Sequence, residues 1–428
     1  MVLILALLGA GAAMLQLQVA EAASVFAHFM VQNSYSYAAS DWESDITTAA
    51  GIGIDGFALN IAQNDYEVDR LADAFSVAEQ QHFKLFFSFD MSYSWASSDM
   101  VSIVQTYATS SAMYTWNNAV LVSTYSGESY GDSFWSAFKS TLAADGITVI
   151  LTPAFTSYRD PSDADSLMSS FPSIDGFFNW WSWPADVDAN LTTATDLAYQ
   201  AVVKSDRTGP FIMSVSPWQF KNLGTNDSDW VELSDTLWYY RWLQAIQDVK
   251  PDIVEIVTWN DYAESHYIGE INPNVDLGDQ APNYVDGFPH TYWRNVAQYF
   301  ISWYKNGSTP TVTDDQVIFW YRGWPKDTTC STGSLPRNYE YPVDAVFALS
   351  LLSSEATVGL YIGSNSFTWD APAGASIGSV PFPSEDAQIP YIEIVRDGTT
   401  TKSGYGSLNV TQSDCSYYNF NPWVGIID

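Results

Sequence analysis

Basic residues, histidine and cysteine are scarce in this chain of 428 residues. Sixteen Lys and Arg stand against 49 Asp and Glu, a formal net charge of −33. A surface of that charge repels phosphate backbones and anionic lipid head groups, which disfavours nucleic acid and membranes as partners. The four histidines form no H-x-H or H-x-x-x-H pair, and CxxC is absent. We therefore predict no metal or other cofactor, although Asp and Glu alone can hold Ca²⁺ or Mg²⁺.

Long apolar runs are missing beyond the amino terminus. Val2 to Leu15 is apolar, and the small-residue run Ala20-Glu21-Ala22-Ala23 follows it. The segment is too short to cross a bilayer and resembles a secretory signal with cleavage after Ala22. It lacks a basic n-region, because the first Lys or Arg is Arg70. We predict a signal peptide at residues 1–23 and a secreted monomer, extracellular or in the cell wall.

Sequons and cysteines agree with secretion. In an oxidising compartment Cys330 and Cys415, the two cysteines, are expected to bridge, which stabilises the region by about 4 kcal/mol for so long a loop. Four Asn-x-Ser/Thr triplets fit a glycoprotein, although such triplets also arise by chance: Asn190, Asn226, Asn306 and Asn409.

Eight strand-like runs can be recognised in the first 261 residues, and a helical pattern follows most of them. This alternation predicts an α/β fold, a (β/α)8 TIM barrel at residues 24–305. Ser40 and Glu43 form a capping box for the first helix, and Gly51 suits its end. The eight runs are Val25 to Val31, Gly56 to Asn60, Lys84 to Asp90, Ala119 to Tyr125, Ile147 to Phe155, Gly176 to Trp181, Pro210 to Pro217 and Ile253 to Asp261.

The composition changes after Asn306. Short β-branched and aromatic runs are separated there by Gly, Pro, Ser and Asp. We predict a small antiparallel β-sandwich-like domain at residues 306–428. Its predicted strands include Val317 to Tyr321, Ala356 to Ile362, Tyr391 to Val395 and Leu408 to Thr411.

Carboxylates at strand ends are the candidate catalytic residues. Asp90 ends the third run, Glu128 follows the fourth, and Asp261 and Glu264 follow the eighth. On a continuous strand two acids three residues apart face opposite sides, so sharing a site requires the chain to turn after Asp261. Cleaving a glycosidic bond needs one acid to protonate the leaving oxygen and a second to activate water. The alternatives are helix capping by Asp90 and an exposed acidic loop at Asp261.

Aromatic and amide side chains also gather at strand ends. Eighteen Trp, 26 Tyr and 23 Phe exceed what ordinary packing needs, although a Trp-rich core explains most of them. In the functional interpretation, the aromatic rings stack on sugars and the amides hydrogen-bond sugar hydroxyls. In the structural interpretation, the same amides only tie loops together. The candidate substrate-binding residues are His28, Asn60, Trp95, Glu128, Trp180, Trp181, Trp218, Trp259, Asn260, Tyr262 and His266, together with Asn179 and Trp183.

The chain resembles the fungal α-1,3-glucanases, or mutanases, of glycoside hydrolase family 71. The resemblance rests on His28-Phe-Met30, Gly53 to Ile61, Phe87 to Asp90, Ser214 to Trp218 and above all Glu255 to Tyr267, which contains Trp-Asn-Asp-Tyr-x-Glu-Ser-His. It implies hydrolysis of α-1,3-glucosidic bonds with inversion, no cofactor, and Asp90, Asp261 and Glu264 as the functional acids. Gln219 stands where the family usually has an aromatic residue.

For the roles we expect Glu264 as general acid, Asp261 as general base and Asp90 as a positioning residue; the first two are interchangeable on the sequence alone. Two other functions stay open. One is a non-catalytic α-glucan-binding wall protein, and the other is the same barrel acting on another α-glycan, such as an α-mannoside.

Overall fold

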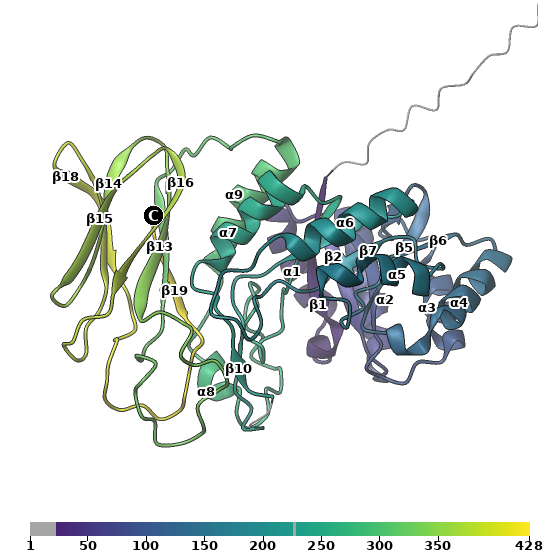
Figure 1. The fold of residues 1–428 in the computed structure, drawn as a ribbon, viewed down its shortest axis with the longest axis horizontal. Coiled ribbons are helices and arrows are strands. Elements are labelled where there is room, and N and C mark those ends of the chain that lie inside the picture. Colours follow the sequence, from purple (N-terminus) through teal and green to yellow (C-terminus); the bar gives the residue numbers. More distant parts are fainter. Residues whose placement is uncertain (1–22, 226–227) are drawn as a thin grey trace, which may run out of the picture.

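A computed structural model describes residues 23–225 and 228–428. Residues 1–22 of the predicted signal peptide and the Asn226 sequon lie outside the described residues. The chain folds into two regions that lie side by side (Figure 1): helices around a parallel sheet, and a pair of antiparallel sheets. Within the described residues, no helix combines the length and the hydropathy of a bilayer span.

Each of the eight predicted runs contains a parallel strand. Their side chains are almost all buried, as expected of a sheet that is covered on both faces. A further strand of two residues, β4 (Thr115–Trp116), pairs antiparallel with β5 (Ala119–Tyr125), the strand of the fourth run. The eight strands are β1 (Ser24–Met30), β2 (Gly56–Ile61), β3 (Lys84–Asp90), β5 (Ala119–Tyr125), β6 (Val149–Leu151), β7 (Phe177–Asn179), β8 (Phe211–Val215) and β11 (Ile253–Ile256).

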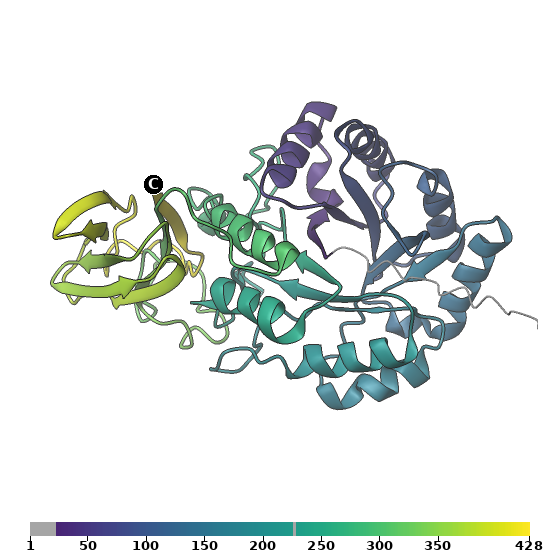
Figure 2. The ribbon, with the colours of Figure 1, turned by 90° about the horizontal axis from the view of Figure 1, so that it is seen from above.

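The strands follow one another around a curled sheet in the order β6-β5-β3-β2-β1-β11-β8-β7 (Figure 2). Strand ladders join every neighbouring pair in this order, but none joins β6 to β7 among the described residues. Three backbone hydrogen bonds link those ends. The N–H groups of Asp175 and Gly176 donate to the Leu151 carbonyl oxygen over 2.8 and 3.2 Å, and the Phe178 N–H donates to that of Pro153 over 3.0 Å. The ladders alone therefore give a curled sheet rather than a closed barrel.

Helices pack outside the sheet and bury their apolar faces against it. A three-residue 3₁₀ turn, η2 (Glu128–Tyr130), follows β5. A short helix, α8 (Pro282–Val285), interrupts the long loop after β11. The others are α1 (Ala39–Gly51), α2 (Glu67–Gln81), α3 (Ser97–Tyr107), α4 (Asp132–Ala144), α5 (Ala164–Ser170), α6 (Ala194–Asp206), α7 (Leu237–Leu243), its π-helical continuation η4 (Gln244–Val249), and α9 (Trp293–Asn306), with the 3₁₀ turns η1 (Val31–Ser34) and η3 (Pro161–Asp163).

The predicted caps of the first helix are wrong. The helix begins at Ala39, one residue before Ser40, so Asp41 takes the position predicted for Glu43, and its carboxylate accepts from the Ala38 N–H over 2.7 Å. At the other end Gly51 is still helical, and the left-handed conformation falls on Gly53, with φ +91°. A short acidic side chain one turn into the helix satisfies the first N–H groups as well as Glu43 would.

The residues after α9 form two four-stranded antiparallel sheets. We call β16-β13-β12-β19 the inner sheet and β15-β14-β17-β18 the outer sheet. Residues Leu408 to Thr411, predicted as a strand, form an isolated bridge between Val410 and Gln388 instead. The strands are β12 (Gln316–Tyr321), β13 (Ala345–Leu352), β14 (Ala356–Ile362), β15 (Asn365–Ala371), β16 (Gly374–Pro381), β17 (Tyr391–Arg396), β18 (Thr399–Tyr405) and β19 (Trp423–Ile427).

The inner sheet is buried on both faces. One face packs on the outer sheet through residues such as Val317 and Phe319. The other joins the core of the helical region: Trp320 lies 6.3 Å from Trp293 of α9 and donates its indole N–H to the Asp235 carbonyl oxygen over 2.9 Å. The predicted disulfide is present between Cys330 and Cys415.

Candidate active site

The two acids after β11 lie on one side of a tight turn, as the sequence required. The Asp261 N–H donates to Thr258 Oγ1 over 2.8 Å, and the Glu264 N–H donates to Asp261 Oδ1 over 3.2 Å. Beyond the turn the chain folds back, because the Thr258 N–H donates to the His266 carbonyl oxygen over 2.8 Å. Asp261 and Glu264 keep 19% and 29% of their side-chain surface exposed, so solvent reaches both carboxylates.

Three donors surround the Glu264 carboxylate. Lys221 Nζ lies 3.1 Å from Oε1, and Gln219 Nε2 and His266 Nε2 lie 3.1 and 3.3 Å from Oε2. Burial alone would raise the pKa of Glu264, but the hydrogen bond and charge of His266, followed by Lys221 and Gln219, lower it to about 2. Glu264 is therefore held as a carboxylate.

Asp261 has the opposite balance. Burial raises its pKa, and the neighbouring negative charge of Glu264 adds to that, while the more distant His266, at 3.8 Å, opposes it. Two carboxyls that share one histidine cannot both ionise easily. The proton of the pair is therefore held preferentially on Asp261.

His266 is the buried centre of the group, with 1% of its surface exposed. Its Nδ1 lies 3.3 Å from Thr258 Oγ1, and its ring lies 5.2 Å from the ring of Trp183. These contacts fix the ring so that Nε2 faces both acids. One oxygen of each acid and one nitrogen of His266 lie within 4.8 Å of one another, the one such group of possible metal ligands in the part of the chain that the structure describes. Lys221 already supplies a cation there, which disfavours a metal.

Tyr125 connects the third acid to the pair. It ends β5 directly opposite Asp90, the last residue of β3. Burial raises the pKa of the Tyr125 hydroxyl to about 12, with contributions from the charges of Glu264, Asp90, Asp261 and Glu128. All four carboxylates therefore act on one phenol at the carboxyl end of the sheet, where α/β barrels place catalytic residues.

Asp90 and Glu128 also make structural contacts. Asp90 Oδ1 accepts from the Ser92 N–H over 3.0 Å and from Ser92 Oγ over 2.7 Å, so it closes a local turn and does not cap the next helix, which begins at Ser97. Glu128 Oε1 accepts from the Ser157 N–H over 2.8 Å and thereby joins the loops after β5 and β6.

Several candidate sugar-binding side chains serve the core instead. Trp218 and Trp259 are 1% exposed, and the indole N–H of Trp218 donates to the Phe420 carbonyl oxygen over 3.0 Å. Trp95 is buried against Phe89, and its indole N–H donates to the Asp90 carbonyl oxygen. None of the three presents an open ring face, so the structure does not support them as sugar platforms. Their aromatic character reflects packing.

Three polar candidates tie loops together. Asn260 brackets Met30 with two hydrogen bonds, accepting from its N–H over 2.7 Å and donating to its carbonyl oxygen over 3.1 Å. Tyr262 donates its hydroxyl to the Glu270 carbonyl oxygen, and Asn179 donates to Asp196 Oδ1, each over 2.7 Å. These side chains shape the acid site without facing it.

Of the remaining candidates, Trp180 contacts Tyr125, the residue opposite Asp90. Half-buried Trp180 packs edge-on against Tyr125, 5.0 Å away, and against His28, 4.9 Å away. His28 Nδ1 is bonded to Glu255 Oε1 over 2.7 Å inside the sheet. Trp181 is covered by the guanidinium of Arg159, 4.1 Å from its ring centroid. Asn60, at the end of β2, is buried, and its side-chain oxygen has no protein partner among the described residues.

Lys221, Gln219 and Tyr125 were missed as site residues. Lys221 and Phe220 form a two-residue strand, β9 (Phe220–Lys221), which pairs with β10 (Trp230–Val231) and so directs the ammonium group to Glu264. Gln219 was noted only as a departure from the family pattern. Tyr125 ends a predicted strand, and that position was a usable signal.

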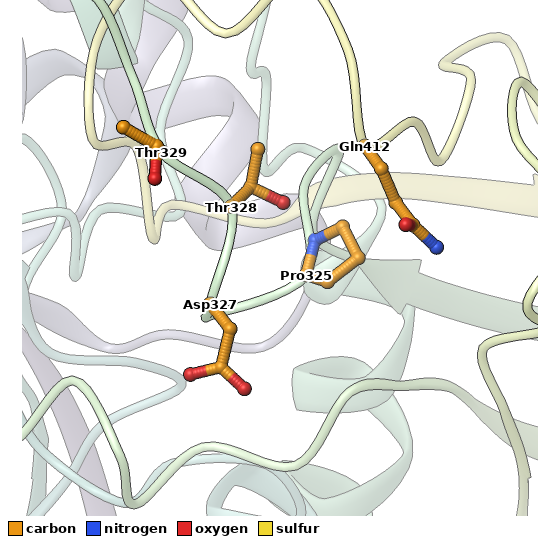
Figure 3. Close-up of a pocket in the computed structure, with 5 residues that line it drawn as sticks. All are labelled: Pro325, Asp327, Thr328, Thr329 and Gln412. Atoms are coloured by element: carbon orange, nitrogen blue, oxygen red, sulfur yellow. The ribbon is translucent and has the colours of Figure 1, made fainter.

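A separate pocket of about 480 Å³ lies in the second region (Figure 3). One carboxylate, two threonine hydroxyls and one amide line it, near the disulfide in sequence: Pro325, Asp327, Thr328, Thr329 and Gln412. It contains no pair of acids and is not a second candidate for hydrolysis.

Comparisons with known proteins agree with this geometry. The model of glycosyl hydrolase family 71 matches residues 21–428. A glucan endo-1,3-alpha-glucosidase of Schizosaccharomyces pombe is 36% identical over 94% of both chains, and a mutanase of Penicillium rubens is 36% identical over 94% of this chain and 88% of its own. An ascus wall endo-1,3-alpha-glucanase of Schizosaccharomyces pombe is 32% identical over 93% of this chain and 96% of its own.

Among solved structures, a GH99 endo-alpha-mannosidase of Bacteroides thetaiotaomicron aligns with a TM-score of 0.51 at 14% identity, covering 66% of this chain and 97% of its own. This likeness concerns the fold alone. The family match and the relatives above go further: the chain belongs to glycosyl hydrolase family 71 and is a glycoside hydrolase.

Proposed function

We propose that this protein is a secreted hydrolase that cleaves the α-1,3-glucosidic bonds of α-1,3-glucan. The proposed substrate follows from the names of the relatives, two of which are glucan endo-1,3-alpha-glucosidases or glucanases and one a mutanase. The observation that carries the chemistry is the Asp261, Glu264 and His266 group, in which the pKa of one carboxyl is raised and that of its neighbour is lowered.

The electrostatics favour Asp261 as the proton donor. A general acid must hold its proton at the working pH, and burial with the adjacent Glu264 charge raises the pKa of Asp261. Glu264, with a pKa lowered to about 2, is a weak base but stays negatively charged beside Asp261. We assign it to stabilise the positive charge that develops on the sugar ring. This moves the proton donor from Glu264, which the sequence alone favoured, to Asp261.

The spacing of the acids bears on stereochemistry. Oxygens of Asp261 and Glu264 lie within 4.8 Å of each other, closer than the roughly 6.5–9.5 Å that inverting enzymes leave for a water between acid and base. Inversion, which the family resemblance implies, therefore needs a base outside this pair, and we propose Asp90, on β3, as the residue that activates the water. Retention would instead assign Glu264 as the nucleophile.

The same proposal includes a closed (β/α)8 barrel and export from the cell. The backbone hydrogen bonds between the ends of β6 and β7 support closure. For export, the asparagines of the three described sequons, Asn190, Asn306 and Asn409, are all exposed, as glycosylation requires.

Incubation of the purified protein with insoluble α-1,3-glucan tests the activity. We expect release of reducing ends, and proton NMR of the first-formed sugar should show the β anomer. No release, with binding retained, would favour a non-catalytic wall protein. A panel of α-linked glycans, α-mannosides included, tests the substrate, since preferred cleavage of another linkage would overturn the proposed one.

A further inference from the structure

Three tyrosines lie side by side across the outer sheet. Tyr361 of β14 is directly opposite Tyr391 of β17, which is directly opposite Tyr405 of β18. Their ring centroids are 5.9 and 4.8 Å apart, and successive rings are tilted by 43° and 46°. We call Tyr361, Tyr391 and Tyr405 the tyrosine row. It forms a continuous, slightly twisted aromatic ridge over three strands.

The row lies on the face of the outer sheet that points away from the rest of the molecule. Side chains alternate along a strand, and the neighbouring Ile392 and Ile394 of β17 are buried in the core between the two sheets, so Tyr391 faces outward. In Figure 1 the outer sheet lies at the end of the molecule farthest from the helices. The inner sheet, by contrast, has both faces covered.

Cross-strand aromatic pairs also stabilise sheets, and that explains part of the row. It does not explain Tyr405, which leaves 69% of its surface exposed at the edge of the row. Nor does it explain Gly359, where an added Cβ would lie 2.6 Å from the Tyr361 ring. The absence of a side chain at Gly359 lets that ring lie flat on the sheet with its other face outward.

Hydrogen-bonding groups accompany the rings. Glu393 accepts from Tyr361 Oη over 3.0 Å, from Tyr391 Oη over 3.4 Å and from Thr400 Oγ1 over 2.8 Å. Exposed hydroxyls on the same face, Ser366, Thr368 and Ser403, lie at register positions beside the row. Flat apolar rings bordered by hydroxyls and a carboxylate match the alternation of apolar faces and hydroxyl edges on a sugar polymer.

We propose that the tyrosine row is a second binding site, for a segment of neutral α-glucan chain, remote from the acids. The occupant follows from charge and shape: a protein of net charge −33 repels polyanions and further copies of itself, whereas a neutral hydroxylated chain pays no such penalty. The choice of α-glucan rests on the proposed function. The site anchors the enzyme on an insoluble polymer while a different stretch of chain is cut.

Binding to insoluble α-1,3-glucan, measured by sedimentation of the full chain, tests the site. All proteins carry Asp261→Asn, so that the polymer stays intact during the assay. The double variant Tyr391→Ala/Tyr405→Ala should bind about tenfold more weakly, because it removes two of the three rings on which the sugar chain stacks. Tyr391→Phe/Tyr405→Phe should bind within about twofold of the parent, because the rings remain. Tyr292→Ala, which removes an exposed tyrosine of the helical region with 40% of its surface accessible, is the control.

Turnover separates this site from the catalytic one. With Asp261 restored, the alanine double variant should cleave soluble α-1,3-oligosaccharides like the wild type and lose activity only on the insoluble polymer. Undiminished binding by the alanine variant would overturn the inference, as would an equal loss on soluble substrate or a dimer that the variant dissociates. If the wild type binds through the row but cleaves nothing, the proposed function fails while the binding site stands.

Discussion

Two charged groups in the helical region are built in opposite ways. In the first, Arg241 of α7 and Asp196 of α6 are both buried and joined by two hydrogen bonds of 2.7 and 2.9 Å. The Arg241 Nε–H donates to the Ser214 carbonyl oxygen, and Asn179 donates to Asp196, so both charges are fully compensated. In the second, Asp261 and Glu264 share one buried histidine and remain open to solvent.

The difference separates a structural ion pair from a reactive one. A closed pair has every charge met by a protein partner, and it joins two helices. An acid pair with one shared donor splits its pKa values, and an exposed oxygen can exchange a proton with a substrate. A buried charge alone therefore does not indicate a catalytic site. A charged group that lacks a full set of protein partners and is open to solvent does.

Removing a carboxyl from the open pair should have the largest effect. Asp261→Asn deletes the proposed proton donor and should lower kcat by roughly 10²- to 10⁴-fold. The midpoint of urea unfolding should barely change, because Asp261 is partly exposed and Glu264, the nearer acid, still faces buried His266. Asp188→Asn, an exposed acid on the loop after β7, serves as control and should change neither quantity. Wild-type kcat in Asp261→Asn would contradict the assignment.

Breaking the closed pair should do the reverse. Arg241→Met leaves Asp196 buried without its cation and should lower the free energy of unfolding by about 3–5 kcal/mol. Turnover per folded molecule should be retained at low temperature. The double variant Asp196→Leu/Arg241→Met should be less destabilised than Arg241→Met alone, because no uncompensated charge remains. Urea unfolding measures both, and equal destabilisation of the two variants would argue against the pair as the cause.

The strands could be predicted from the sequence because buried parallel strands are continuous apolar runs with abrupt ends. The exact bounds of Lys84–Asp90 and Ala119–Tyr125 followed from such ends. The predicted closure of the sheet stays a prediction, since no strand ladder joins β6 to β7 in the described residues and their ends meet through loop residues that carry no apolar pattern. The cap of α1 failed because Asp41 and Glu43 are equally plausible partners, and only the exact start of the helix selects one.

The acids could be predicted because carboxylates at strand ends are conspicuous. The shifts in their pKa values could not be predicted. Lys221 and Gln219 reach Glu264 from a different loop, through pairing of β9 with β10, which sequence spacing does not reveal. The exposure of the tryptophans could not be predicted either. Trp218 and Trp180 both follow strands, yet Trp218 is 1% exposed and Trp180 is half-buried. Which way a side chain points after a strand ends depends on the loop.

Removing a donor from the Glu264 carboxylate should change the pH dependence of activity. Lys221→Gln removes a positive charge 3.1 Å from the carboxylate, so the pKa of Glu264 should rise towards its ordinary value. Glu264 is then ionised only at higher pH, and the acidic limb of kcat/KM should move upward by about one unit. Lys204→Gln, an exposed lysine of α6, should leave the limb in place. An unshifted limb in Lys221→Gln would mean that Glu264 does not set it.

A buried acid without a closed partner should give the smallest effect, on stability alone. Burial raises the pKa of Glu232 to about 7, although a backbone hydrogen bond from Ala185 and the charge of Arg159 oppose it. Because the folded-state pKa lies above the ordinary value of 4.5, its contribution to stability is complete below about pH 4.5 and is lost as the pH rises through about 7. Glu232→Gln mimics the protonated form and should match the wild type in thermal unfolding at pH 4.5 but exceed it at pH 8. The control Glu43→Gln, on the exposed face of α1, should match the wild type in thermal unfolding at both pH values. If Glu232→Gln also matches the wild type at both, ionisation of Glu232 does not lower the stability of the fold.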